Sequence, residues 1–274
     1  MKNNILIAGA VVVVLGSLAA YIYWPQSEPV PVPVRVKTPP PPPPPAPPVV
    51  PQVVEVPSPP PPPPEPALPP LPKLANSDKF VLDAIAGLVS NKSMMKLFHT
   101  KRIIHNIVAT IDNLTGRRAP MSVMPVKRVP GKFITAGTDS DLVISPENAA
   151  RYKPYVRIVK AVDTGKLVGL YVRLYPLFQQ AYEELGYPKK YFNDRLIVVI
   201  DNMLAAPKIE GPVKLVQPNV FYLYSDPKLE GRSIGQRILM RIGSKNEAAV
   251  KSKLREFKRE LMLHMQENKI VSAE

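Results

Sequence analysis

The chain has 274 residues, of which 36 are Lys or Arg and 22 are Asp or Glu, so its formal net charge is +14. It has no cysteine, which excludes disulfides, thiol catalysis, cysteine-ligated metals and a lipid anchor on cysteine. The positive charge favours anionic partners such as phospholipid, an anionic envelope polymer or nucleic acid, although a solvated basic surface has the same composition.

The first predicted element is a membrane span at residues 5–24. The stretch ILIAGAVVVVLGSLAAYIYW has no charged residue, and at about 1.5 Å per residue a helix of this length crosses a bilayer's hydrocarbon core. A cleaved signal peptide is the alternative, because residues 17–19 form a small-x-small site. The apolar run continues past that site and only Lys2 precedes it, so we expect residues 1–24 to remain as an anchor.

Residues 25–73 predict a proline-rich linker, since 25 of the 36 prolines lie between Pro25 and Pro72. Proline fixes φ and has no N–H donor, so such a segment adopts an extended polyproline helix. At about 3.1 Å per residue the linker extends at most on the order of 150 Å. We interpret it as a spacer; a ligand for proline-recognising domains is the alternative.

The positive charges that flank the span are nearly balanced, with Lys2 on one side and Arg35 and Lys37 on the other. A short leader before a first span usually stays in the cytoplasm. We therefore predict a single-pass protein of the bacterial inner membrane whose carboxyl-terminal domain is periplasmic.

Residues 74–274 predict a mainly α domain with one or two short β-hairpins. Apolar residues recur at helical spacing in several segments, and the first of these helices would be capped by Asn76 or Ser77. Proline and glycine punctuate the two hairpin candidates, at residues 120–144 and 212–224. The predicted helices are residues 76–89, 93–114, 154–162, 167–185, 195–204, 233–242 and 244–265.

Three local signals refine the helix boundaries. Ser145-Pro146-Glu147 indicates a helix start, with a capping residue followed by proline in the first turn. Pro154 is expected to begin the next helix, and Ser244 and Glu247 form a capping box at the start of the last one. The face of the last helix opposite its apolar residues is expected to be a solvated basic row. This row consists of Lys251, Lys253, Arg255, Lys258 and Arg259.

The sequence shows no catalytic signature, and we predict neither an enzyme nor a metal or cofactor site. His99 and His105 are six residues apart and do not share a helical face, which argues against a histidine-based metal site. Asp201 lies in an apolar stretch, where we expect an ion pair with a residue such as Arg195 rather than acid/base catalysis.

Rows of basic residues are the best candidates for binding an anion. Lys153, Arg157 and Lys160 would share one stripe of a helix, and Arg237 and Arg241 form an i,i+4 pair. Such rows contact phosphate or carboxylate groups without sequence specificity, although a charged row is also typical of a solvated helix face.

Tyrosines are dense between residues 152 and 191, mostly at helical spacing that indicates core packing. Tyr187 and Tyr191 stand beside Gly186 and Pro188, where a turn is expected. We therefore predict that these two tyrosines are exposed and contact a partner.

Five stretches resemble bacterial proteins classed as domain of unknown function 3014. They are LPKLANSD at residues 71–78, IDNL at 111–114, NAARYKPYV at 148–156, YPLFQQAYEELGYP at 175–188 and GQRILMRIGSKN at 235–246. The resemblance implies a bacterial envelope protein, commonly with the same anchor and proline linker, and it carries over no functional residue.

Together these features predict a membrane-anchored interaction or scaffolding protein of the cell envelope. Its expected partners are the inner membrane and the cell wall or another envelope protein, with an anionic ligand. The alternatives are an enzyme acting on an envelope polymer and a cytoplasmic nucleic-acid-binding module, the latter disfavoured by the predicted topology.

Overall fold

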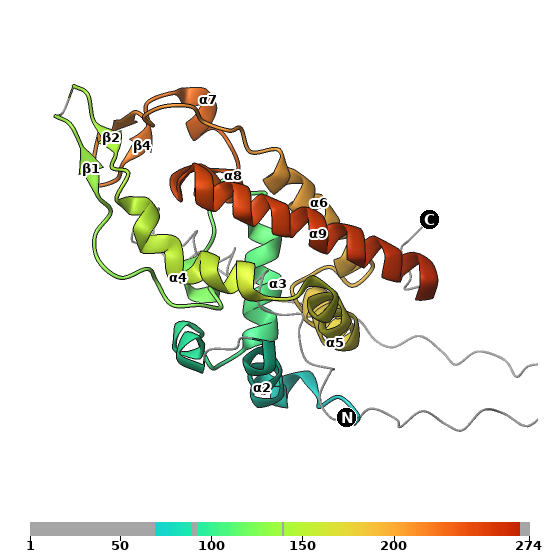
Figure 1. Ribbon diagram of the computed structural model, residues 1–274. Helices are drawn as coiled ribbons and strands as arrows, with labels where there is room; N and C mark the ends of the chain where they lie inside the picture. Colours follow the sequence, from blue (N-terminus) through green and yellow to red (C-terminus); the bar gives the residue numbers. More distant parts are fainter. Residues whose placement is uncertain (1–68, 89–91, 139, 269–274) are drawn as a thin grey trace, which may run out of the picture. The chain divides into compact units, whose positions relative to one another are not determined.

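The structure is a computed structural model that describes residues 69–88, 92–138 and 140–268; the predicted span and most of the predicted linker lie outside these residues. The described part is mainly helical (Figure 1), as the sequence predicts. Its α-helices are α2 (Asp78–Leu88), α3 (Ile103–Asn113), α4 (Asn148–Ala161), α5 (Thr164–Glu184), α6 (Phe192–Leu204), α7 (Pro227–Glu230), α8 (Ile234–Arg241) and α9 (Ser244–Asn268). Its 3-10 helices are η2 (Leu74–Asn76), η3 (Lys92–Leu97) and η4 (Met121–Val123).

The core forms around α9, which contacts α4, α5, α6 and α8. Figure 1 shows α9 above α4 and α5, with α3 running from beneath α9 toward α2. The buried side of α9 carries apolar residues three and four positions apart, which is the pattern that places them on one helical face. They are Val250, Leu254, Phe257 and Leu261, each at most 2% exposed.

Two small antiparallel hairpins lie at one end of the helical part (Figure 1). The first pairs β1 (Thr135–Ala136) with β2 (Val143–Ile144), and the second pairs β3 (Leu215–Val216) with β4 (Leu223–Tyr224). A bridge between Val143 and Lys214 joins the hairpins. Both predicted hairpins are therefore confirmed, and they are adjacent in space.

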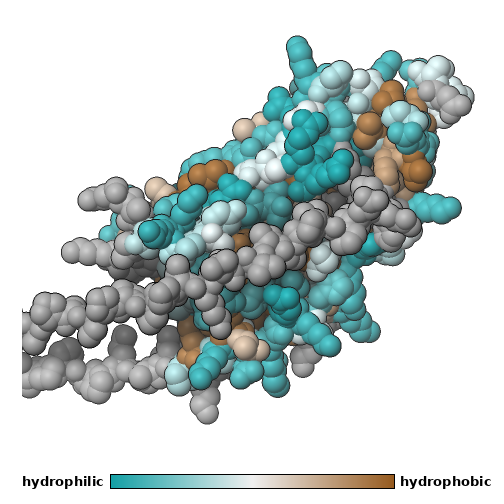
Figure 2. Space-filling model, turned by 180° about the vertical axis from the view of Figure 1, so that it is seen from behind, coloured by the Kyte–Doolittle hydropathy of each residue, from teal (hydrophilic) through white to brown (hydrophobic). Residues whose placement is uncertain are grey.

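The surface seen from behind in Figure 2 is mostly hydrophilic. Hydrophobic residues gather in this view at the end that carries the hairpins. The second hairpin contributes two exposed valines, Val216 and Val220.

The predicted helix at residues 93–114 is wrong as a single element. The chain forms η3, then an extended stretch in which Phe98 pairs with Val126, and only then α3. Asp78 stabilises this break, because its carboxylate accepts hydrogen bonds from the backbone N–H groups of Arg102 and Ile103, both at 2.8 Å. Apolar spacing along the sequence does not reveal such a pairing between distant segments.

Pro154 does not begin a helix but lies inside α4, which starts six residues earlier. The Ser145-Pro146-Glu147 signal precedes that true start, and an internal proline removes one N–H donor without ending the helix. Ser77 precedes α2 as predicted, but its hydroxyl donates to the Leu74 carbonyl instead of capping the helix.

Candidate functional site

Three basic residues of α4 surround one shallow depression, as their spacing predicts. Lys153, Arg157 and Lys160 line it together with Val156, Ala161 and Asn246. All three basic residues are exposed, and none of them forms a hydrogen bond or ion pair through its side chain with another described residue. We call this surface the α4 basic patch; its positive charge is available to an external anion.

Arg237 and Arg241 do not belong to an exposed row, which corrects the prediction that pairs them as anion ligands. Arg237 is 2% exposed, forms an ion pair with Glu230 and donates to the Arg117 carbonyl. Burial, reinforced by the neighbouring charge of Arg241, lowers the pKa of Arg237 to about 10.

Arg241 is 3% exposed and lies over the Tyr224 ring, 4.7 Å from its centroid. It donates to the Tyr222 carbonyl at 2.8 Å. An i,i+4 spacing is the same for buried and exposed residues, so only the packing of α8 against the second hairpin reveals that these arginines are structural.

Tyr187 and Tyr191 line a second shallow depression, which also includes Val198 at 53% exposure. Tyr187 stacks on Tyr182 with ring centroids 4.6 Å apart, and its hydroxyl donates to Asp112 at 3.2 Å. The negative charge of Asp112, followed by burial, raises the pKa of Tyr187. Both predicted contact residues are half-buried, so each offers only part of its ring to a partner.

The predicted pair between Asp201 and Arg195 is wrong, although each residue has an ionic partner. Asp201 accepts from Lys258 of α9 at 2.6 Å and 2.8 Å. Arg195 instead pairs with Asp112 of α3 at 2.7 Å. Both pairs connect helices, which gives these carboxylates a structural role.

The basic row of α9 is only partly solvated, contrary to expectation. Lys251 is 8% exposed, pairs with Glu247 at 2.6 Å and donates to the Ala206 carbonyl at 2.5 Å. Lys253 pairs with Glu256 and donates to the Val162 carbonyl. These lysines fix α9 to neighbouring segments.

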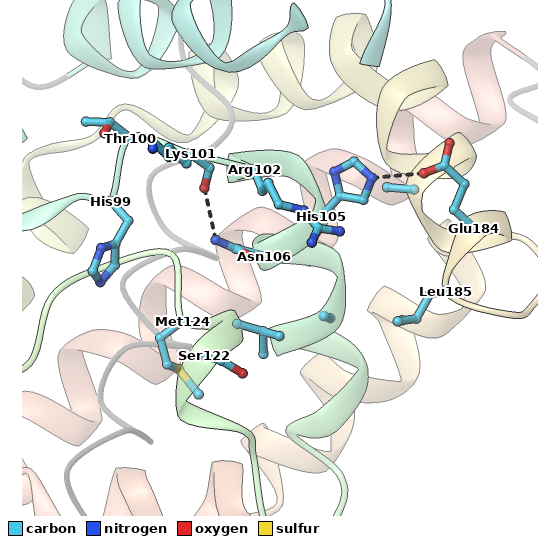
Figure 3. Close-up of a pocket in the computed structure, with 13 residues that line it drawn as sticks. His99, Thr100, Lys101, Arg102, His105, Asn106, Ser122, Met124, Glu184 and Leu185 are labelled. Atoms are coloured by element: carbon cyan, nitrogen blue, oxygen red, sulfur yellow. Dashed lines mark hydrogen bonds and ion pairs between the residues drawn. The ribbon is translucent and has the colours of Figure 1, made fainter. Parts of the chain in front are cut away.

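A larger pocket, of about 710 Å³, lies at the amino end of α3 (Figure 3), where the sequence predicted no site. We call it the α3 pocket. Its wall joins residues from the stretch before α3, from η4 and from the end of α5. The lining residues used below are His99, Lys101, Arg102, His105, Asn106, Val123, Met124, Glu184 and Leu185.

His105 and Glu184 form the only ion pair among the residues that line the α3 pocket. His105 Nε2 lies 2.9 Å from a carboxylate oxygen of Glu184, and Gln180 donates to the other oxygen at 3.0 Å. The hydrogen bond with His105 is the main cause that lowers the pKa of Glu184. Lys101 and Arg102, which lie between His99 and His105 in the sequence, were the sequence signal for this pocket. The single helix predicted over residues 93–114 concealed it.

Acidification should therefore remove stability that Glu184 contributes. Its pKa is lowered on folding, so this stability is present above the ordinary value of 4.5 and is lost as the pH falls through the folded value. The midpoint temperatures of thermal unfolding of the native chain and of Glu184→Gln should differ near neutral pH. This difference should shrink toward about pH 3. Glu210→Gln, which removes an exposed carboxylate, is the control and should show no such convergence. A constant difference across this range would contradict the prediction.

The described residues contain no group of three or more His, Cys, Asp or Glu side chains that is arranged to hold a metal ion. Among the helices in the described part of the chain, none combines the length and the apolar character needed to cross a membrane. The predicted span at residues 5–24 lies outside that part and stays a prediction.

These features define a mainly helical domain with two small hairpins, an exposed basic patch and a pocket with basic residues on its rim. Residues 103–258 match the family described as protein of unknown function (DUF3014). The chain belongs to this family, which confirms the resemblance found in the sequence. No curated protein and no solved structure matches the chain.

Proposed function

We propose that this protein is a membrane-anchored interaction module of the bacterial cell envelope with no enzymatic role. Residues 1–24 hold it in the inner membrane, and the proline-rich linker keeps the basic domain away from the bilayer. The domain lies in the periplasm and binds an anionic polymer of the envelope.

The observation that carries this proposal is the α4 basic patch. Three cationic side chains converge on one depression and form no ion pair with the described residues. Elsewhere on the domain, basic residues such as Arg237, Lys251 and Lys258 are occupied by carboxylates of the same chain. The patch is thus a place where positive charge remains available for a partner.

Co-sedimentation with purified cell-wall sacculi tests the proposal. The full-length protein in nanodiscs of zwitterionic lipid should sediment with sacculi, and added salt should weaken binding by screening the charges. The variant Lys153→Gln, Arg157→Gln, Lys160→Gln should bind at least about tenfold more weakly, because charged contacts carry this association.

The control variant Arg118→Gln, Lys132→Gln, Lys166→Gln removes the same charge from exposed positions outside the patch and should bind like the native chain. Equal binding by all three proteins would contradict the role of the patch. Preferential binding to duplex DNA, together with a carboxyl-terminal reporter active only in the cytoplasm, would favour the nucleic-acid alternative. Cleavage of the sacculi would favour the enzyme.

A further inference from the structure

We propose that the α3 pocket binds a small organic anion in which a phosphate ester is joined to an apolar group. This site is separate from the α4 basic patch, and the proposal does not depend on the function assigned to that patch. It rests on the charge, the apolar lining and the rigid walls of the pocket.

The charge of the pocket suits a phosphate. Lys101 and Arg102 are exposed, and the side chain of neither forms a hydrogen bond or ion pair with another described residue. Glu184 is the only carboxylate in the lining, and His105 and Gln180 already hold it. The positive charges of Lys101 and Arg102 therefore balance the charge of a phosphate monoester, which is about −1.5 to −2 at neutral pH. Arg and Lys donors form charge-assisted hydrogen bonds with its oxygens.

The lining of the pocket also has an apolar part. Leu185 is a large hydrophobic residue that remains 43% exposed at the pocket wall, and Val123 and Met124 lie in the same lining. Figure 3 shows Leu185 below the His105–Glu184 pair and Met124 beside Ser122, so apolar side chains come from two sides. An apolar group attached to the phosphate would remove the exposed surface of Leu185 and the partly exposed surface of Val123 from water, which stabilises the complex.

The walls are fixed before any ligand arrives. Asp78 holds the backbone of Arg102, the one non-glycine residue with positive φ (53°) among those described. Asn106 Nδ2 donates to the Lys101 carbonyl at 3.1 Å, and Thr110 Oγ1 donates to the Val123 carbonyl at 2.9 Å. Because Asp78 already caps the first amides of α3, binding depends on the side chains of the rim and not on the helix end. Such pre-organisation lowers the entropic cost of binding.

The α3 pocket also has a volume suitable for a small organic molecule. Its volume of about 710 Å³ lies within the range of about 300–1,000 Å³ that is typical of small-molecule sites. A phosphate with a short alkyl chain therefore fits without rearrangement of the surrounding helices.

Calorimetric titration with hexyl phosphate tests the proposal on the full-length protein in zwitterionic nanodiscs, with empty nanodiscs as the reference. Hexyl phosphate should bind more tightly than inorganic phosphate, and hexanol should not bind measurably. Lys101→Gln, Arg102→Asn should weaken hexyl phosphate binding at least about tenfold. Asparagine is chosen at position 102 because it tolerates a positive φ.

Two further variants separate charge from packing and from loss of fold. Lys166→Gln, Arg118→Asn removes the same charge outside the pocket and should bind normally. Leu185→Ser should weaken binding of hexyl phosphate but not of inorganic phosphate. The α4 basic patch variant should bind hexyl phosphate like the native chain, so failure of the sacculus experiment and failure of this one are distinguishable.

Dihexanoyl phosphatidylglycerol, below its micelle concentration, distinguishes a lipid headgroup from a free phosphate ester. Tighter binding of this lipid than of hexyl phosphate, lost in Lys101→Gln, Arg102→Asn, would support the proposal with a lipid as the source. Tighter binding of hexyl phosphate would support a soluble ligand. Binding of either compound that is unaffected by Lys101→Gln, Arg102→Asn, or no binding at all, would overturn the proposal.

Discussion

Replacing Phe257 with alanine is expected to lower the free energy of unfolding by about 3–5 kcal/mol, the usual cost when truncation of a buried aromatic residue leaves a cavity. Phe257 is fully buried at the centre of α9, and its ring and that of Tyr171 from α5 form a T-shaped pair with centroids 5.9 Å apart. The substitution thus removes one of the contacts that pack α9, the longest of the described helices, against the core.

Urea unfolding of the full-length chain in nanodiscs, followed by its helical circular dichroism, measures this loss. Met262→Ala is the matched control, because Met262 lies on the same helix but is 39% exposed; its effect should stay within about 0.5 kcal/mol. Similar urea midpoints for both variants would contradict the prediction that burial of Phe257 packs α9 against the core.

Arg237→Ala should have a comparable effect, of about 3–5 kcal/mol, because removal of one partner leaves a buried charge without compensation. The partner is Glu230, whose side chain is 18% exposed and also accepts from the backbone N–H of Tyr224 at 2.9 Å. The Arg117 carbonyl loses a donor in the same variant.

A double variant shows whether the uncompensated charge is the cause. Arg237→Met combined with Glu230→Gln removes both charges and should be more stable than Arg237→Met alone. Arg157→Ala, at an exposed position of the α4 basic patch, should change the unfolding free energy by at most about 0.5 kcal/mol. If the double variant were the less stable of the two, the ion pair would not explain the effect of Arg237.

The long helices could be predicted from the sequence because their burial follows from local periodicity. Leu167, Leu170, Tyr171, Leu174, Leu177 and Phe178 recur every three or four residues, and all are buried in α5. Residues 195–204 are likewise predicted to be helical, which α6 confirms. The turn residues around Pro218 also predicted the second hairpin correctly.

The features that were missed depend on contacts between segments far apart in the chain. The break before α3 requires Asp78 and Val126, which lie on either side of it. The burial of Arg237 requires Glu230 and the backbone of Arg117. The α3 pocket likewise appears only when the end of α5 lies beside the start of α3, so no local pattern predicts it.

The difference between local spacing and contacts between distant segments also explains which predicted site residues lie where the sequence placed them. Lys153, Arg157 and Lys160 share a face because all three belong to one helix, and helical spacing alone brings them together. Tyr187 lies on a turn, but its position depends on Asp112 and Tyr182, which come from two other elements. Residue spacing therefore predicts the composition of a single face more reliably than the surroundings of a turn.

The place of α9 in the chain has a consequence for biogenesis. It follows every other described element, yet it covers apolar faces of α4, α5 and α6. A nascent polypeptide that has emerged only as far as α8 still exposes those faces, so we expect the core to close only after α9 has left the ribosome.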